Sequence, residues 1–196
     1  MNSIDFEAIK PSCLDGVKYS LASKERTILL CDEVTQESVL EAMYYLYRFK
    51  TIDTKKKAKK PITILIDTPG GSVYDGLMLI SLIESMRDEG WEINTVNIGT
   101  AYSMGFIISL VGTHRYAYRY SSYLLHDISL EIGGNARSIK EKMEETDRLS
   151  TIMCDIIKKY TDISEDEIED IFSHKKDKIY SCEKAVELKI CDKIIY

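Results

Sequence analysis

The chain has 196 residues, which is long enough for one domain with a sizeable apolar core. Hydrophobic residues make up 44% and charged residues 30%, a balance typical of a soluble globular protein and unlike that of a disordered or membrane-spanning chain. The net charge of -6 disfavours nucleic acid as the main partner, because phosphate binding depends on Lys and Arg.

The first half of the chain alternates predicted strands and helices. Residues 25–34 (ERTILLCDEV), 62–67 (ITILID) and 93–98 (INTVNI) have the composition of buried strands. Helices are expected from Thr35, from about Val73 to Arg87, and from near Ser103. This alternation predicts parallel strands joined by right-handed crossovers, and therefore an α/β fold. The apolar face of the first helix is expected to hold Val39, Leu40, Met43, Leu46 and Tyr47.

The second half is more helical. Residues 115–126 (RYAYRYSSYLLH) predict two short strands, and Ala136 to Tyr160 predicts one long amphipathic helix. Ser164 with Glu167 forms a capping box for another short helix, and Ser181 is expected to cap a helix between two small strands. The apolar face of the long helix is expected to hold Ile139, Met143, Leu149, Met153, Ile156 and Ile157.

The cysteines and the N-terminal residues indicate the cellular compartment of the protein. The five cysteines are scattered and show no CxxC spacing, which predicts neither a disulfide framework nor a zinc site and suits a reducing compartment. The first residues, MNSIDFEAIK, lack the basic start and the apolar stretch of a secretory signal, and no segment has the length of about 20 apolar residues that spans a bilayer. We therefore expect a cytoplasmic protein with no membrane segment.

Residues with catalytic potential follow two of the predicted strands. The pair Gly70-Gly71 comes after the second strand, and Ser103 comes after the third, at the start of a helix. Because the carboxyl ends of parallel strands meet at one edge of a sheet, the N–H groups of Gly71 and Met104 could together hold an oxyanion. A serine hydroxyl needs an adjacent base, and His126, at the end of YLLH, is a natural candidate.

Taken singly, these residues have ordinary explanations. A serine at this position is more often a helix cap, and a histidine at a strand end is more often simply hydrogen-bonded. The glycine pair is more often a plain turn or a phosphate-binding loop. The carboxylate that would orient His126 is left open by composition, because the chain has 32 acidic residues.

Four motifs in a fixed order resemble one known family. They are IDTPGGSVYDGL at 66–77, AYSMGFIISLVG at 101–112, YLLH at 123–126 and KKDKIYSCEKAVELKICD at 175–192. From about Glu25 to Asp192 the chain resembles ClpP, the proteolytic subunits of Clp proteases, which are serine peptidases with a crotonase-like fold. The resemblance implies a divergent N-terminal segment at 1–24, a single peptidase domain at 25–196, and a projecting handle region at about 127–160 with a long helix.

The resemblance also implies roles for five residues. Ser103 aligns with the nucleophile, His126 with the general base and Asp177 with the aspartate that orients the histidine. Gly71 and Met104 align with the oxyanion donors. Asp177 is selected by the resemblance alone. No metal or organic cofactor is expected.

The implied partners are further copies of the chain and an unfoldase. The family forms seven-membered rings stacked as tetradecamers, which degrade peptides or unfolded proteins delivered by an AAA+ unfoldase that uses ATP. One departure follows His126, where the family usually has Gln-Pro and a Gly-Gly pair; residues 127–131 here read Asp-Ile-Ser-Leu-Glu. In the family this segment binds the substrate backbone and helps to pair two rings. The family docks the unfoldase in a hydrophobic pocket rich in aromatic residues. Tyr116 is aromatic at one of these positions, whereas Thr63 and Leu65 occupy positions that are often aromatic.

Three alternatives are compatible with parts of this pattern. A non-catalytic Clp-like ring subunit typically lacks triad residues, all of which are present here. A crotonase-type acyl-CoA enzyme shares the fold and a pair of amide donors, but does not need the Ser, His and Asp set. A signal-peptide peptidase of the Ser-Lys type is disfavoured by the absence of a membrane segment and by the position of His126.

Overall fold

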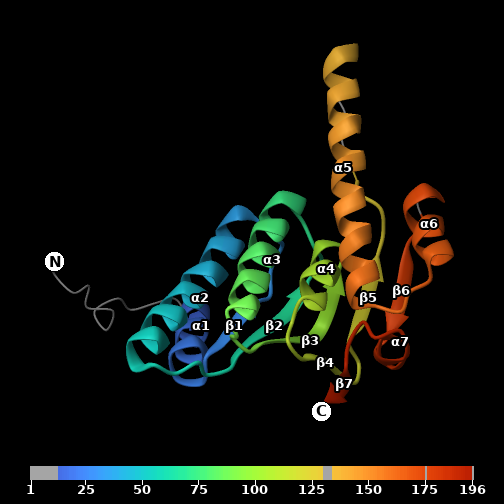
Figure 1. Cartoon of the computed structure of the whole chain (residues 1–196). Coiled ribbons are helices and arrows are strands. Elements are labelled where there is room, and N and C mark those ends of the chain that lie inside the picture. Colours follow the sequence, from blue (N-terminus) through green and yellow to red (C-terminus); the bar gives the residue numbers. More distant parts are fainter. Residues whose placement is uncertain (1–12, 130–133, 175, 196) are drawn as a thin grey trace.

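The computed structural model describes residues 13–129, 134–174 and 176–195. Within them the strands form one seven-stranded sheet with a main order of β1-β2-β3-β4-β7 (Figure 1). β5 pairs with β3 and β6, and only the β5–β6 pair is antiparallel. The α/β fold with a mainly parallel sheet is therefore confirmed. The strands are β1 (Thr27–Leu30), β2 (Ile62–Thr68), β3 (Ile93–Tyr102), β4 (Arg115–Tyr118), β5 (Ser122–Leu125), β6 (Lys178–Ser181) and β7 (Lys193–Ile195).

Several helices begin at a residue whose side chain accepts an N–H group of the first turn. Thr35 Oγ1 accepts the Ser38 N–H, and Ser38 Oγ accepts the Thr35 N–H in return, a reciprocal box that starts the second helix. Ser181 caps the last helix by accepting the Lys184 N–H. The helices are α1 (Cys13–Ser20), α2 (Gln36–Lys56), α3 (Val73–Asp88), α4 (Met104–Leu110), α5 (Ala136–Tyr160), α6 (Glu165–His174) and α7 (Cys182–Glu187), with a short π-helical turn, η1 (Leu21–Glu25), after α1.

Only half of the predicted capping box at α6 forms. Ser164 Oγ accepts the Glu167 N–H, as expected. The Glu167 carboxylate does not return to the cap; it accepts a hydrogen bond from the Tyr180 hydroxyl and pairs with Lys178. The Glu167 carboxylate therefore contacts residues of the neighbouring strand β6 and not the backbone N–H of Ser164.

The predicted apolar face of α2 is partly wrong. Val39 and Leu46 are buried as expected, but Leu40 and Tyr47 are 50% and 51% exposed. The helix carries two apolar stripes, and the one that faces the core runs through positions 39, 42, 46 and 49, at steps of three and four residues. Periodicity alone does not separate the stripes, because Leu40, Tyr44 and Tyr47 also recur at steps of three and four residues.

The long helix α5 has the bounds predicted from its periodicity. Its C-terminal half packs on the core through Leu149, Met153 and Ile157, whereas Met143 is 54% exposed. The N-terminal end of α5 projects beyond the rest of the chain (Figure 1). Residues 130–133 of the predicted handle region lie outside the described residues.

The central strand β3 changes partners along its length. Its first half pairs with β4, from Thr95 to Asn97, and its last residues pair with β5, from Thr100 to Tyr102. β3 therefore continues past Gly99, where the sequence predicted its end. This change places the end of β3 beside the end of β5, so that the residues following the two strands become neighbours.

Candidate active site

The turn after β2 is built from two glycines with positive φ. Gly70 has φ 98° and Gly71 has φ 144°, values that residues with a Cβ rarely adopt. The turn is bound to the loop after β1, because the Gly70 carbonyl accepts the Val34 N–H at 2.7 Å and the Ser72 N–H donates to the Val34 carbonyl at 2.7 Å. Within the described part of the chain the Gly71 N–H has no acceptor, so it remains available to a ligand.

Ser103 lies on the sharp turn between β3 and α4. Its backbone has φ 53° and ψ -120°, an unusual conformation for a residue with a side chain. The Ser103 N–H donates to the Leu124 carbonyl at 2.8 Å, which ties the turn to β5. The Ser103 hydroxyl makes no capping hydrogen bond. The ordinary explanation of this serine as a helix cap therefore does not apply.

Gly70 allows the two turns to approach closely. A Cβ at position 70 would lie 2.5 Å from the Ser103 Cβ and 2.7 Å from the Tyr102 carbonyl oxygen. Only a glycine at this position leaves room for Ser103, so the backbone of the first turn supports the second directly.

A cavity of about 220 Å³ brings four of the five predicted site residues together. Ser103 and His126 both line it, as do Gly71 and Met104, the two residues predicted to donate N–H groups. Met104 is the first residue of α4, where N–H groups have no acceptor within the helix. The complete lining consists of Pro69, Gly71, Val73, Ser103, Met104, His126, Asp127, Ile128, Ser129 and Met153.

Asp177 lies outside the cavity lining but next to His126. The Asp177 Oδ1 atom is 3.6 Å from His126 Nδ1, within ion-pair distance but longer than a hydrogen bond. The His126 side chain is 30% exposed and that of Asp177 is 68% exposed. The antiparallel register of β5 and β6, which pairs Leu125 with Lys178, makes His126 and Asp177 the next facing pair.

Apart from the segment after His126, which binds the substrate backbone in the family, sequence reasoning missed the remaining walls of the cavity. Val73, Ile128 and Met153 contribute apolar side chains, and Asp127 contributes a carboxylate. Asp127 directly follows the candidate base and lies in the segment that binds the substrate backbone in the family, and these two signals could have identified it. Met153 was expected on the apolar face of α5, but periodicity does not reveal which cavity a helix covers.

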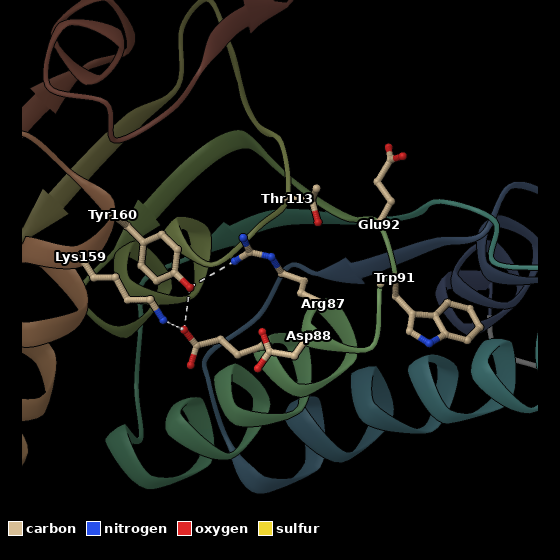
Figure 2. Close-up of a pocket in the computed structure, with 9 residues that line it drawn as sticks. Arg87, Asp88, Trp91, Glu92, Thr113, Lys159 and Tyr160 are labelled. Carbon is tan, nitrogen blue, oxygen red and sulfur yellow. Dashed lines mark hydrogen bonds and ion pairs between the residues drawn. The ribbon is translucent and has the colours of Figure 1, made fainter.

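A second cavity, of about 600 Å³, lies between the C-terminal ends of α3 and α5 (Figure 2). The Glu84 carboxylate accepts hydrogen bonds from the Tyr160 hydroxyl at 2.6 Å and from Lys159 Nζ at 2.7 Å. Arg87 Nη1 donates to the Tyr160 hydroxyl and to the Val111 carbonyl. These contacts join α5 to α3, and the lining contains no serine or cysteine nucleophile. We assign this cavity a structural role.

The described residues contain neither a cluster suited to a metal ion nor a helix suited to crossing a membrane. Across residues 13–129, 134–174 and 176–195, no three His, Cys, Asp or Glu residues gather in a group that could hold a metal ion. In the same part of the chain, no helix combines the length and apolar character needed to cross a membrane.

Comparison with known proteins gives a consistent result. The family model described as Clp protease matches residues 15–196, so the match starts earlier than the motifs indicated. The "ATP-dependent Clp protease proteolytic subunit 3" of Rhodococcus jostii (strain RHA1) is 28% identical over 174 residues, covering 88% of this chain and 82% of the relative. The corresponding subunit 2 of Chlamydia trachomatis serovar D is 28% identical over 182 residues, with 90% and 84% covered. Subunit 1 of Prochlorococcus marinus (strain MIT 9312) is 30% identical over 184 residues, with 90% and 87% covered. The chain therefore belongs to the Clp protease family, as its four motifs predicted.

Proposed function

We propose that this protein is a serine endopeptidase that hydrolyses peptide bonds through Ser103, His126 and Asp177. One observation carries the proposal. Ser103, held in a strained backbone conformation and free of any capping hydrogen bond, lines the same cavity as His126, and His126 Nδ1 lies 3.6 Å from the Asp177 carboxylate. Strained residues with side chains concentrate at functional sites. The family and the names of the relatives support the same activity.

In the proposed mechanism Ser103 Oγ attacks the carbonyl carbon of the scissile bond while His126 Nε2 accepts the hydroxyl proton. Asp177 stabilises the resulting imidazolium through Nδ1, for which the 3.6 Å separation must shorten to about 2.8 Å. The tetrahedral intermediate expels the amine, which takes the proton from His126, and an acyl-serine ester remains. Water, deprotonated by His126, then attacks the ester and releases the acid product.

The N–H groups of Gly71 and Met104 are proposed to stabilise the oxyanion of the tetrahedral intermediate. Both residues line the cavity with Ser103. The Met104 N–H belongs to the N-terminal turn of α4, where the helix dipole favours negative charge. One such donor typically contributes about 10²- to 10³-fold to kcat.

A fluorophosphonate probe tests the nucleophile, because it reacts covalently with an activated serine. We expect the wild-type protein to be labelled and Ser103→Ala not to be. The control is Ser81→Ala, an exposed serine of α3 outside the cavity, which should be labelled as the wild type is. Equal labelling of Ser103→Ala and wild type would remove Ser103 from the proposed role.

The orienting carboxylate is tested by a matched pair of substitutions. Asp177→Asn should slow labelling by about 10²-fold or more, because the imidazolium loses its stabilising charge. Asp170→Asn provides the control, since Asp170 is also an exposed carboxylate beside a histidine, 3.2 Å from His174 Nδ1. Equal rates for the two variants would argue against a catalytic role for Asp177.

We further propose that the chain assembles into seven-membered rings stacked as a tetradecamer and works with an AAA+ unfoldase in the cytoplasm. The relatives are named as subunits of ATP-dependent proteases, which supports the unfoldase. The second apolar stripe of α2 supports assembly, because Leu40, Tyr44 and Tyr47 are about half exposed in the single chain. We also propose that residues 1–24 form a divergent N-terminal segment and that residues 25–196 form a single peptidase domain.

A further inference from the structure

The cavity beside Ser103 combines an apolar wall with one acidic side chain. Val73, Ile128 and Met153 supply the apolar part, and Asp127 supplies the carboxylate. Its volume of about 220 Å³ is several times the roughly 30 Å³ that one water molecule occupies in the liquid, so a single side chain has room to enter. A side chain with an apolar stem and a charged tip matches this combination.

The Asp127 carboxylate is held in place through one oxygen. Oδ1 accepts the Ile128 N–H at 2.8 Å and the Ser150 hydroxyl at 3.4 Å, whereas the described residues place no donor on Oδ2. The second oxygen therefore keeps its full capacity to accept a hydrogen bond from a ligand.

No cation in the described chain neutralises Asp127. Every described Lys and Arg lies beyond ion-pair distance of this carboxylate, and the ion pair of His126 is with Asp177 instead. A half-buried carboxylate without a cation is unfavourable and gains from a positively charged partner. The lining contains no Lys or Arg that would repel such a partner.

From this geometry we infer that the cavity binds a lysine or arginine side chain, on the acyl side of the scissile bond, through the Asp127 carboxylate. The inference rests on the proposed peptidase function and adds a substrate class to it. The apolar stem of the substrate side chain packs against Val73, Ile128 and Met153, while its cationic end donates to Asp127 Oδ2. Asp127 thus determines specificity and takes no part in proton transfer.

Two fluorogenic peptides that differ at one position test this inference. One carries lysine immediately before the scissile bond, and the other carries norleucine, which has the same stem without the amine. Hydrogen bonds to charged groups typically change binding by about ten- to hundredfold, so kcat/KM of the wild type should favour lysine by tenfold or more. Asp127→Asn keeps the size and the Oδ1 acceptor, and should bring the ratio of kcat/KM for lysine to that for norleucine close to one.

The control is Asp155→Asn, which removes the same charge from an exposed position of α5 outside the cavity and should keep the preference for lysine. A second measurement does not depend on turnover: peptidyl phosphonate esters with lysine or norleucine at the same position should modify Ser103 at rates with the same ratio, followed by intact mass.

The outcomes separate the two proposals. Equal rates for lysine and norleucine in the wild type, or an unchanged preference in Asp127→Asn, would overturn the inference about Asp127 while modification of Ser103 still supports the peptidase. A protein in which no phosphonate and no fluorophosphonate modifies Ser103 would overturn the peptidase and the specificity together.

Discussion

Ser103 shows how one residue depends on its neighbour for its geometry. Its φ of 53° is unfavourable by about 1–3 kcal/mol for a residue with a side chain, and it persists because the surrounding turns enforce it. Gly70 is the main neighbour, because its missing Cβ is what lets the Ser103 turn approach. The geometry of the candidate nucleophile is therefore encoded at position 70 as well as at position 103.

Gly70→Ala should consequently disable the site. The added Cβ would overlap the Ser103 Cβ and the Tyr102 carbonyl, and φ 98° is itself unfavourable for alanine. We expect fluorophosphonate labelling to slow by at least about tenfold, since a displaced nucleophile loses its alignment. The measurement is the labelling rate, with circular dichroism to confirm that the variant is folded.

Gly90→Ala is the matched control. Gly90 has a similar φ of 85°, but a Cβ there meets only Lys59 Nζ at 3.5 Å. This variant should lose about 1 kcal/mol of stability or somewhat more from the backbone conformation, and it should label at the wild-type rate. A Gly70→Ala protein that labels as fast as Gly90→Ala would contradict the role of close approach.

At the same scale, sequence reasoning could predict Ser103 and His126 but not Asp177. The first two follow strands whose ends must meet at one edge of a parallel sheet. Asp177 faces His126 only through the register of β5 and β6, which are far apart in the chain. Register depends on tertiary pairing, so a resemblance to known proteins was needed to select this carboxylate among the many acidic residues.

At the scale of elements, helix boundaries were more predictable than helix faces. The bounds of α5 and the start of α3 follow from periodicity and from capping side chains, which are local signals. The buried face of α2 was partly mispredicted because two stripes share the same helical spacing, and tertiary packing determines which of them is buried. The length of β3 was underestimated because its last residues depend on pairing with β5.

The contact between α3 and α5 predicts a pH-dependent stability. Burial raises the pKa of the Glu84 carboxyl, but the hydrogen bonds from Lys159 and Tyr160 lower it by more than burial raises it. The pKa therefore lies below its ordinary value of 4.5. A carboxyl with a lowered pKa stabilises the fold above pH 4.5, and this contribution is lost as the pH falls through the pKa of the folded state.

Glu84→Gln should therefore lower the free energy of unfolding at pH 7 by about 1 kcal/mol, or Tm by about 2–4 °C. The difference from wild type should shrink as the pH is lowered below 4.5, in thermal melts recorded at both values. Glu89→Gln, at the exposed C-terminal end of the same helix, should change Tm less at pH 7. A deficit of Glu84→Gln that stays constant with pH would indicate that the carboxylate charge contributes nothing.

At the scale of the whole molecule, the exposed stripe on α2 supports the proposal that several chains assemble. Leu40, Tyr44 and Tyr47 are all about half exposed along one side of the helix. Apolar side chains gathered in this way are typical of surfaces that another protein covers.

Tyr47→Glu should reduce the assembled mass, because a buried charge without a partner opposes association. Light scattering over a range of concentrations measures this mass, for which we expect a ring oligomer in the wild type. The same substitution at Tyr120, which is 94% exposed and lies on a loop after β4, should leave the mass unchanged. A monomeric wild type, or identical masses for the two variants, would contradict assembly through α2.

The projecting helix α5 connects two distant parts of the molecule. The helix is continuous from its projecting N-terminal end to the core, with a rise of about 1.5 Å per residue. Close to the core, the helix carries Ser150, whose hydroxyl donates to Asp127, and Met153, which forms part of the wall beside Ser103. Because the same continuous helix forms the projecting end and part of the cavity wall, a displacement of the helix along its axis would also move Met153 beside Ser103.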